Sequence, residues 1–135
     1  MKRYFGIAIL ALTLAGCMAE KSGQAESTSG AQDYAEYCAA CHGALGKGDG
    51  IAANGLTKAP ANLSALTRTN GGTFPTTRVM AQIWGYAGAK GRGVMPGFGP
   101  MLAGETMPYD GGDGILTPTP KRLVALAEYL KQLQR

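Results

Sequence analysis

The residues best suited to chemistry stand together at positions 38–42, which read Cys-Ala-Ala-Cys-His. Two thiols three positions apart can add to the two vinyl groups of one haem, because that spacing fits about one turn of helix. The next residue, His42, can then offer its imidazole to the iron. The pentapeptide therefore predicts covalent haem attachment through Cys38 and Cys41, with His42 as an axial ligand.

Two other kinds of site use the same residue types. A thioredoxin-like redox dithiol also has the Cys-x-x-Cys spacing, but it accompanies a βαβ pattern, and the chain shows no strand-like runs. A zinc site needs four ligands, usually from paired Cys/His clusters. The chain has Cys17 as its only other cysteine and His42 as its only histidine. Both alternatives are weaker than haem attachment.

A second axial ligand is expected in a loop far from His42. Met95 is the strongest candidate, because Pro96 stiffens the following backbone and the neighbouring glycines allow a close approach to the ring. Met101 is a weaker candidate, and Met80 and Met107 are weaker still. The competing interpretation is that Met95 only fills space in the core. A pair of histidine ligands is excluded, since no second histidine exists.

The elements that must hold these residues are predicted to be helices. Ser29 and Gln32 have the spacing of a capping box, so a helix is expected from about Gly30 through Cys41. A second helix should begin at Phe74-Pro75 and end at Gly85 or Gly88, with an inward face made of Val79, Met80, Ile83 and Trp84.

The last helix is predicted over Pro120–Gln134, with Thr119 as its N-cap. Its apolar stripe comprises Leu123, Leu126, Ala127, Leu130 and Leu133. Between the helices we expect a glycine-rich loop at Gly43–Gly55, a short helix around Leu63–Arg68 and a long loop at Gly91–Gly114. No segment shows a strand pattern, so the predicted fold class is all-α, with short helices and long loops.

The N-terminus resembles a bacterial lipoprotein leader. Met1–Arg3 is basic, Phe5–Ala15 is apolar but too short to span a bilayer, and Leu14-Ala15-Gly16-Cys17 follows. We expect residues 1–16 to be a signal peptide removed before Cys17, Cys17 to carry the lipid, residues 17–30 to be a flexible tether and residues 31–135 to form the domain. The alternative is an ordinary secretory leader cut after Ala19 or Ala25.

Taken together, the chain resembles a class I cytochrome c from about Gln32 to Leu133. The resemblance rests on Cys38-Ala39-Ala40-Cys41-His42-Gly43, on Met95-Pro96 and on the terminal amphipathic helix. It implies one covalent haem c wrapped by the chain. It also implies crossing terminal helices that pack Tyr34 and Tyr37 against Leu126, Tyr129 and Leu130.

The resemblance implies further roles around the haem. The carbonyl of Pro60 should accept a hydrogen bond from the His42 imidazole, which fixes the tautomer. Trp84, Lys90 and Arg92 are candidates for contacts with the propionates. The stretch from Gly104 to Leu116 departs from the family pattern.

The expected function is one-electron transfer outside the cytoplasmic membrane, in a respiratory chain, with no bond chemistry and no small-molecule substrate. The partners should be redox proteins of the membrane or periplasm, on the periplasmic side of a bacterial membrane. An accessory subunit of an oxidase or dehydrogenase remains an alternative, and a gas-binding module a weaker one. A haem peroxidase is also weaker, with Glu105 and Asp110 as its candidate acids.

The charge of the chain does not favour binding to nucleic acid. The formal charge of +4 includes two basic residues of the leader, so from Cys17 onward 11 Lys and Arg against 9 Asp and Glu give +2. The basic residues are scattered, which does not favour nucleic acid as a partner.

The run Asp110–Gly114 suggests calcium only faintly, because it lacks the full loop spacing and the terminal Glu.

Overall fold

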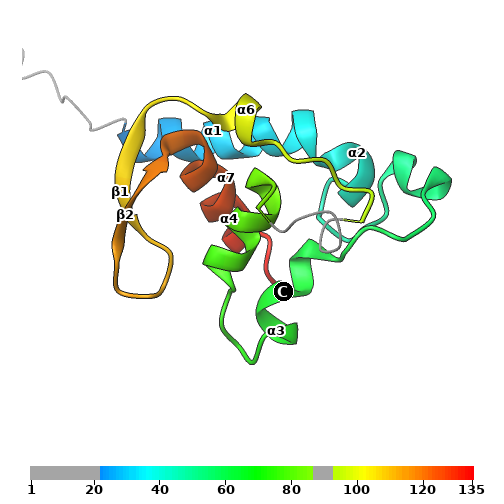
Figure 1. Ribbon diagram of the computed structural model, residues 1–135. Coiled ribbons are helices and arrows are strands. Elements are labelled where there is room, and N and C mark those ends of the chain that lie inside the picture. The colour runs from blue at the N-terminus through cyan, green and yellow to red at the C-terminus, as the bar shows by residue number, and fades with distance from the viewer. Residues whose placement is uncertain (1–21, 87–92) are drawn as a thin grey trace, which may run out of the picture.

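The computed structural model describes residues 22–86 and 93–135. These residues form short helices joined by loops, together with one hairpin (Figure 1). The elements in chain order are α1 (Ser22–Tyr37), α2 (Ala39–His42), 3-10 turns at Ile51–Gly55 and Leu63–Ala65, α3 (Leu66–Thr69), α4 (Thr76–Trp84), α6 (Gly99–Leu102), β1 (Thr106–Asp110), β2 (Leu116–Pro120) and α7 (Lys121–Gln132).

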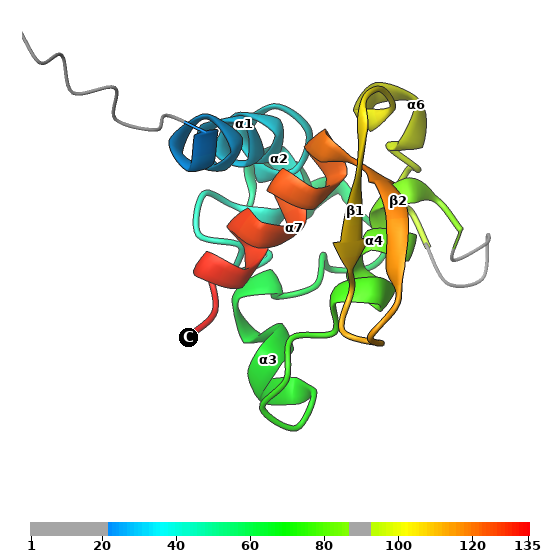
Figure 2. The ribbon, with the colours of Figure 1, turned by 90° about the vertical axis from the view of Figure 1, so that its left-hand side faces the viewer.

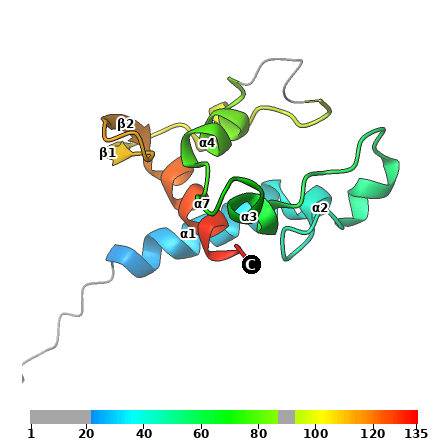
Figure 3. The same ribbon diagram turned by 90° about the horizontal axis from the view of Figure 1, so that it is seen from below.

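The core forms where α1 crosses α7, and α4 packs on the other side of α7 (Figures 1 and 3). Gly30 lies at the crossing, where an added Cβ would stand 2.1 Å from the backbone oxygen of Ala125. The rings of Tyr34 and Tyr129 pack beside this point, with centroids 5.3 Å apart. The predicted apolar stripe of α7 faces the core: Leu123, Leu126, Ala127 and Leu130 are buried, and Leu133 is half-buried.

The first helix begins earlier than predicted. It starts at Ser22 rather than Gly30, so the last part of the proposed tether is helical. Ser29 therefore does not begin a helix, and Gly30 lies inside one. Glycine is a poor helix former, but at this position its missing side chain lets α7 approach closely, and helices in proteins are stabilised mainly by packing.

The hairpin corrects the prediction that the chain has no strands. β1 and β2 are antiparallel, with Met107 opposite Thr119 and Tyr109 opposite Thr117. Met107 and Tyr109 are half-buried and alternate with three exposed residues, which is the pattern of a strand with one buried face. The run contains prolines, which are uncommon in strands because proline cannot donate a ladder hydrogen bond.

The prolines suit the edges of this small sheet. Pro108 lies opposite Pro118, and neither has an N–H, so their pair must be of the type that exchanges no hydrogen bonds. Pro120 lies two residues after Pro118, so its pair with Thr106 is also of the type that exchanges no hydrogen bonds. At these positions the missing N–H groups would have pointed outward, so both outer edges of the hairpin lose donors for pairing with another chain.

The hairpin also changes how the last helix begins. Thr119 is paired in β2 and donates its hydroxyl to the Thr117 carbonyl, so it is not the predicted N-cap. Helix α7 begins one residue after Pro120, and the Lys121 N–H donates to the Glu105 carbonyl at 2.8 Å. The other end of the hairpin is held to α7 by Tyr109, whose hydroxyl contacts the Glu128 carboxylate at 2.5 Å.

Helix α4 follows the prediction closely, whereas α6 and the 3-10 turn at Ile51–Gly55 lie within segments predicted as loops. In α4 the side chains of Val79, Met80 and Ile83 are buried, and Trp84 is half-buried. The helix ends at Gly85, whose φ of 109° suits glycine. None of the helices in the described ranges is long and apolar enough to cross a membrane. Figure 2 shows α7 between α1 and the hairpin.

Candidate haem site

The Cys–His run lies where α1 passes into α2. The Cys38 N–H still donates to the Tyr34 carbonyl, and the Cys38 carbonyl accepts from the N–H groups of Cys41 and His42 at 3.2 and 2.9 Å. These bonds make one helical turn from Cys38 to His42. The predicted geometry, with both thiols and the imidazole presented by a single turn, is therefore present in the fold.

The two thiols are free, and one of them is buried. Cys38 is 8% exposed and Cys41 is half-buried. Burial, with a smaller effect of the Asp33 charge, raises the pKa of the Cys38 thiol to about 12. Redox-active dithiols need a lowered thiol pKa, so this environment does not suit that chemistry. Among the described residues, no cluster of three or more His, Cys, Asp or Glu side chains could hold another metal ion.

The His42 ring has a defined orientation. Its Nδ1 atom lies 2.9 Å from the Ala61 carbonyl oxygen, and because a carbonyl can only accept, Nδ1 carries the proton. The other ring nitrogen, Nε2, is then left with a lone pair for iron. The predicted acceptor was Pro60, and that prediction is wrong by one residue. The Pro60 carbonyl instead lies against Gly48, where an added Cβ would be 2.5 Å away from it.

The glycine-rich loop after His42 folds tightly around this turn. The Gly48 N–H donates to the His42 carbonyl at 2.8 Å, and the Gly50 N–H donates to the Cys41 carbonyl at 3.1 Å. Gly48 has a φ of 84°, a conformation that other residues rarely adopt. An added Cβ at Gly50 would lie 2.3 Å from the Ala40 carbonyl oxygen. The loop thus fixes the turn by hydrogen bonds to its last two residues.

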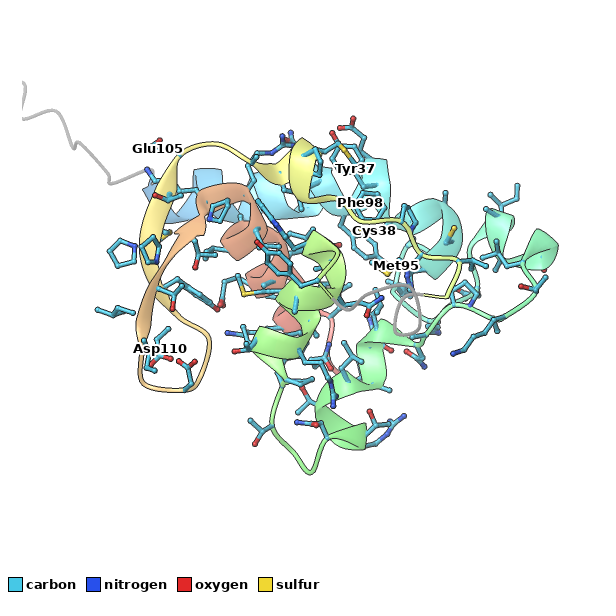
Figure 4. All side chains as sticks on the ribbon, viewed as in Figure 1. Tyr37, Cys38, Met95, Phe98, Glu105 and Asp110 are labelled. Atoms are coloured by element: carbon cyan, nitrogen blue, oxygen red, sulfur yellow. The ribbon has the colours of Figure 1, made fainter. Side chains whose placement is uncertain are left out.

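Met95 lies on a loop that packs against the core cluster containing Cys38. In Figure 4 the two residues lie close together in projection, with Phe98 and Tyr37 beside them. The Met95 sulfur is 3.7 Å from Nε2 of Gln82 on α4. Figure 4 also shows Glu105, just before β1, and Asp110, at the end of β1, away from Met95 in this view.

The other methionines of the described residues have different positions. Met80 is buried in the core cluster. Met107 belongs to β1, where it is paired with Thr119. Met101 is 40% exposed on α6, where its carbonyl accepts from Arg122. Among the described methionines, Met95 is thus the one that lies on a loop outside the helices and strands.

Comparison with known families decides the identity of the fold. The family model described as Cytochrome c matches residues 27–134, from α1 through the end of α7. The chain belongs to the cytochrome c family. The searches of curated proteins and of solved structures found no match. Membership makes this cytochrome a haem-based electron carrier with covalently bound haem c, and the mostly helical fold agrees with the predicted class.

The residues of this cytochrome fit a haem. Two free thiols and an imidazole with an available Nε2 lie on one turn, and a thioether lies on a loop packed against the same core. Cys38 and Cys41 would hold the porphyrin, and His42 would hold the iron. The two thiols would form the covalent links to the porphyrin, and imidazole and thioether are the ligand types that hold iron in cytochromes c.

Several predicted residues have other contacts or cannot be placed. Tyr34 packs on Tyr129 as the resemblance implied, whereas the ring of Tyr37 is 6.0 Å from that of Phe98. Glu105 pairs with Lys121, and the Asp110 carboxylate accepts three backbone N–H groups of its own turn, which lowers its pKa. Cys17, Lys90 and Arg92 lie outside the described residues.

Sequence reasoning missed two residues of the site. Ala61 acts through its backbone carbonyl, for which its side chain carries no signal. Gln82 could have been noticed, because it is a polar residue one position before the predicted inward-facing pair Ile83 and Trp84. Its contact with Met95 depends on how α4 packs on the loop, and this is a tertiary relationship.

Proposed function

We propose that this protein is a class I, monohaem cytochrome c that carries one electron between redox partners through a haem ligated by His42 and Met95. The observation that supports this most is the His42 ring, which sits in the attachment motif with Nδ1 donating to Ala61 and Nε2 free for iron. The haem, when bound, supplies the ferrous and ferric states. A thioether opposite the imidazole raises the potential, as suits an electron carrier.

The chain's own residues position this centre and close it. The Ala61 carbonyl orients the imidazole, and its hydrogen bond makes the ring a stronger donor. The Met95 loop is held to α4 by a backbone hydrogen bond from Phe98 to the Ile83 carbonyl at 2.8 Å. Since His42 and Met95 would together hold the iron, no open position would remain for a substrate, so we assign the domain no bond chemistry.

Spectra of the matured protein test this assignment. With His42 and Met95 both bound, the reduced and oxidised spectra should be low-spin, and carbon monoxide should not change the reduced spectrum at neutral pH. Met95→Ala should open the iron and allow carbon monoxide to bind, while Met101→Ala, the matched control, should leave the spectrum unchanged. Ready carbon monoxide binding by the unaltered protein would contradict the carrier function and favour a catalyst or gas-binding module.

We also propose that the protein acts on the periplasmic side of a bacterial membrane, anchored by lipid on Cys17 after removal of residues 1–16. The support is the run Leu14-Ala15-Gly16-Cys17 behind a short apolar leader. Several acyl chains give stable anchoring, where one chain gives only marginal binding. Cys17→Ser should release the haem-loaded protein into the soluble periplasmic fraction. Retention of this variant in washed membranes would contradict the anchor.

The proposed partners are redox proteins of the same membrane or of the periplasm, in a respiratory chain. A lipid anchor would raise the effective concentration of the carrier near them. A free shuttle should migrate at the size of the single chain after mild detergent extraction. Co-migration with an oxidase or dehydrogenase would instead assign it as a subunit of that complex.

A further inference from the structure

The end of α4 holds the Met95 loop at three consecutive positions. Gln82 contacts the Met95 sulfur, the Ile83 carbonyl accepts from the Phe98 N–H, and the Trp84 ring lies against Gly99. An added Cβ at Gly99 would be 2.9 Å from Cε2 of Trp84, so the loop lies directly on the ring. Two of these contacts only place the loop. The contact of Gln82 reaches the proposed ligand atom itself.

The direction of that contact is set by chemistry. A thioether sulfur has no hydrogen and can only accept, so the side-chain amide of Gln82 is the donor across the 3.7 Å between Nε2 and Sδ. Both side chains are half-buried. Partial exclusion of water strengthens such a bond relative to one in solvent.

We propose that Gln82 is a positioning residue that raises the reduction potential by donating a hydrogen bond to the axial sulfur of Met95. This inference rests on the proposed His42–Met95 ligation. An amide N–H draws electron density from the sulfur, which then donates less to the iron. The ferric ion depends more on that donation than the ferrous ion does, so the bond favours the reduced state. Hydrogen bonding around axial ligands is one of the ways a protein sets the potential of its haem.

The sign of the effect separates this role from simple packing. Replacing the amide with an apolar side chain makes the surroundings of the iron less polar, and that change alone disfavours the more highly charged ferric state. Polarity alone therefore predicts a rise in potential for Gln82→Leu. Loss of the hydrogen bond predicts a fall.

The test is a redox titration of the haem-loaded protein and its Gln82→Leu and Gln82→Met variants. At a fixed applied potential we expect the ratio of oxidised to reduced protein to rise about fivefold, which is a fall of about 40 mV at 59 mV per tenfold for one electron. The control is Gln132→Leu, the same change at an exposed position of α7, which should leave the potential unchanged.

Ligation is checked in each variant by its low-spin spectrum and by its failure to bind carbon monoxide. An unchanged or raised potential with ligation intact would overturn the proposal. Loss of ligation in both Gln82 variants would also overturn it, because Gln82 would then only hold the loop in place. Failure of the ligand assignment itself is distinguishable, since Met95→Ala would then leave the spectrum unchanged.

Discussion

The carboxylate of Asp33 on α1 and the guanidinium of Arg122 on α7 meet where the two helices cross, with O–N distances of 2.5 and 3.2 Å. Asp33 is only 4% exposed, so its charge depends on this partner. Arg122 also donates to the Met101 carbonyl at 2.6 Å. One side chain thus ties both terminal helices to α6, a few residues beyond the Met95 loop.

Arg122→Met should lower the free energy of unfolding by about 3 kcal/mol, because it leaves a buried carboxylate without its partner. Adding Asp33→Leu should recover much of the loss, since the unpaired charge is then removed. Urea denaturation measures both. As a control, Glu105→Gln breaks an exposed pair with Lys121 and should cost less than about 1 kcal/mol. An equal loss in the single and double variants would contradict this account.

Tyr34 should make the protein less stable at high pH. Burial raises the pKa of Tyr34 from 10.0 to about 12. Below pH 10 the hydroxyl keeps its proton in both states, so this contribution to stability is fully present. Between pH 10 and 12 the unfolded chain loses the proton while the folded chain keeps it, and the free energy of unfolding falls by about 2 kcal/mol.

The comparison is with Tyr34→Phe, measured by urea denaturation at about pH 8 and about pH 11. At pH 8 the variant should be less stable by about 1 kcal/mol, because it lacks the 2.6 Å hydrogen bond from Tyr34 to the Gly43 carbonyl. At pH 11 this difference should shrink or reverse. Tyr86→Phe, at a side chain 78% exposed, is the control and should follow the unaltered protein. A constant gap across pH would refute the assignment to Tyr34.

Gly30→Ala should destabilise the fold by about 1–3 kcal/mol, since the new methyl group would meet the backbone of Ala125 and push α7 away. Thermal unfolding of the haem-loaded protein measures this. Gly55→Ala is the matched control, because nothing lies within 4 Å of an added Cβ there. Its effect should be close to zero or slightly stabilising. If both variants have the same melting temperature, close packing at position 30 does not require glycine.

Haem attachment should be required for a stable fold. From Ala31 onward the chain has only 28 large apolar residues in 105 positions. This small apolar core must also hold the loops between the short helices in place. A chain with Cys38→Ala and Cys41→Ala, which cannot be linked to haem, should show no cooperative thermal transition by circular dichroism. A sharp transition like that of the haem-loaded protein would show that the polypeptide core suffices.

The local features of the chain could be predicted because they depend on neighbours in sequence. The Cys–His turn, the inward face of α4 and the buried stripe of α7 follow from residue spacing, and the structure has all three. The end of α4 at Gly85 also follows, since glycine favours the left-handed conformation found there. The haem cofactor and the cytochrome c family were both predictable from one pentapeptide and its surroundings.

Other features depended on contacts between distant parts of the chain. α1 extends back to Ser22 and tolerates Gly30 because α7 packs on it. The hairpin at Thr106–Pro120 forms despite its prolines because they occupy pairs that exchange no hydrogen bonds between the strands. Tyr109 also holds the hairpin to α7. The register of two strands, like the packing of two helices, depends on both partners and cannot be predicted from the residues of one partner alone.

Residue types and spacing were enough to predict a covalently bound haem, since thiol and imidazole groups carry their reactivity with them. Which carbonyl faces the His42 ring, and which side chain reaches the Met95 sulfur, came only from folding. The reason is that a backbone carbonyl looks the same at Pro60 and Ala61. An amide such as that of Gln82 gains a role only when packing brings it to its acceptor.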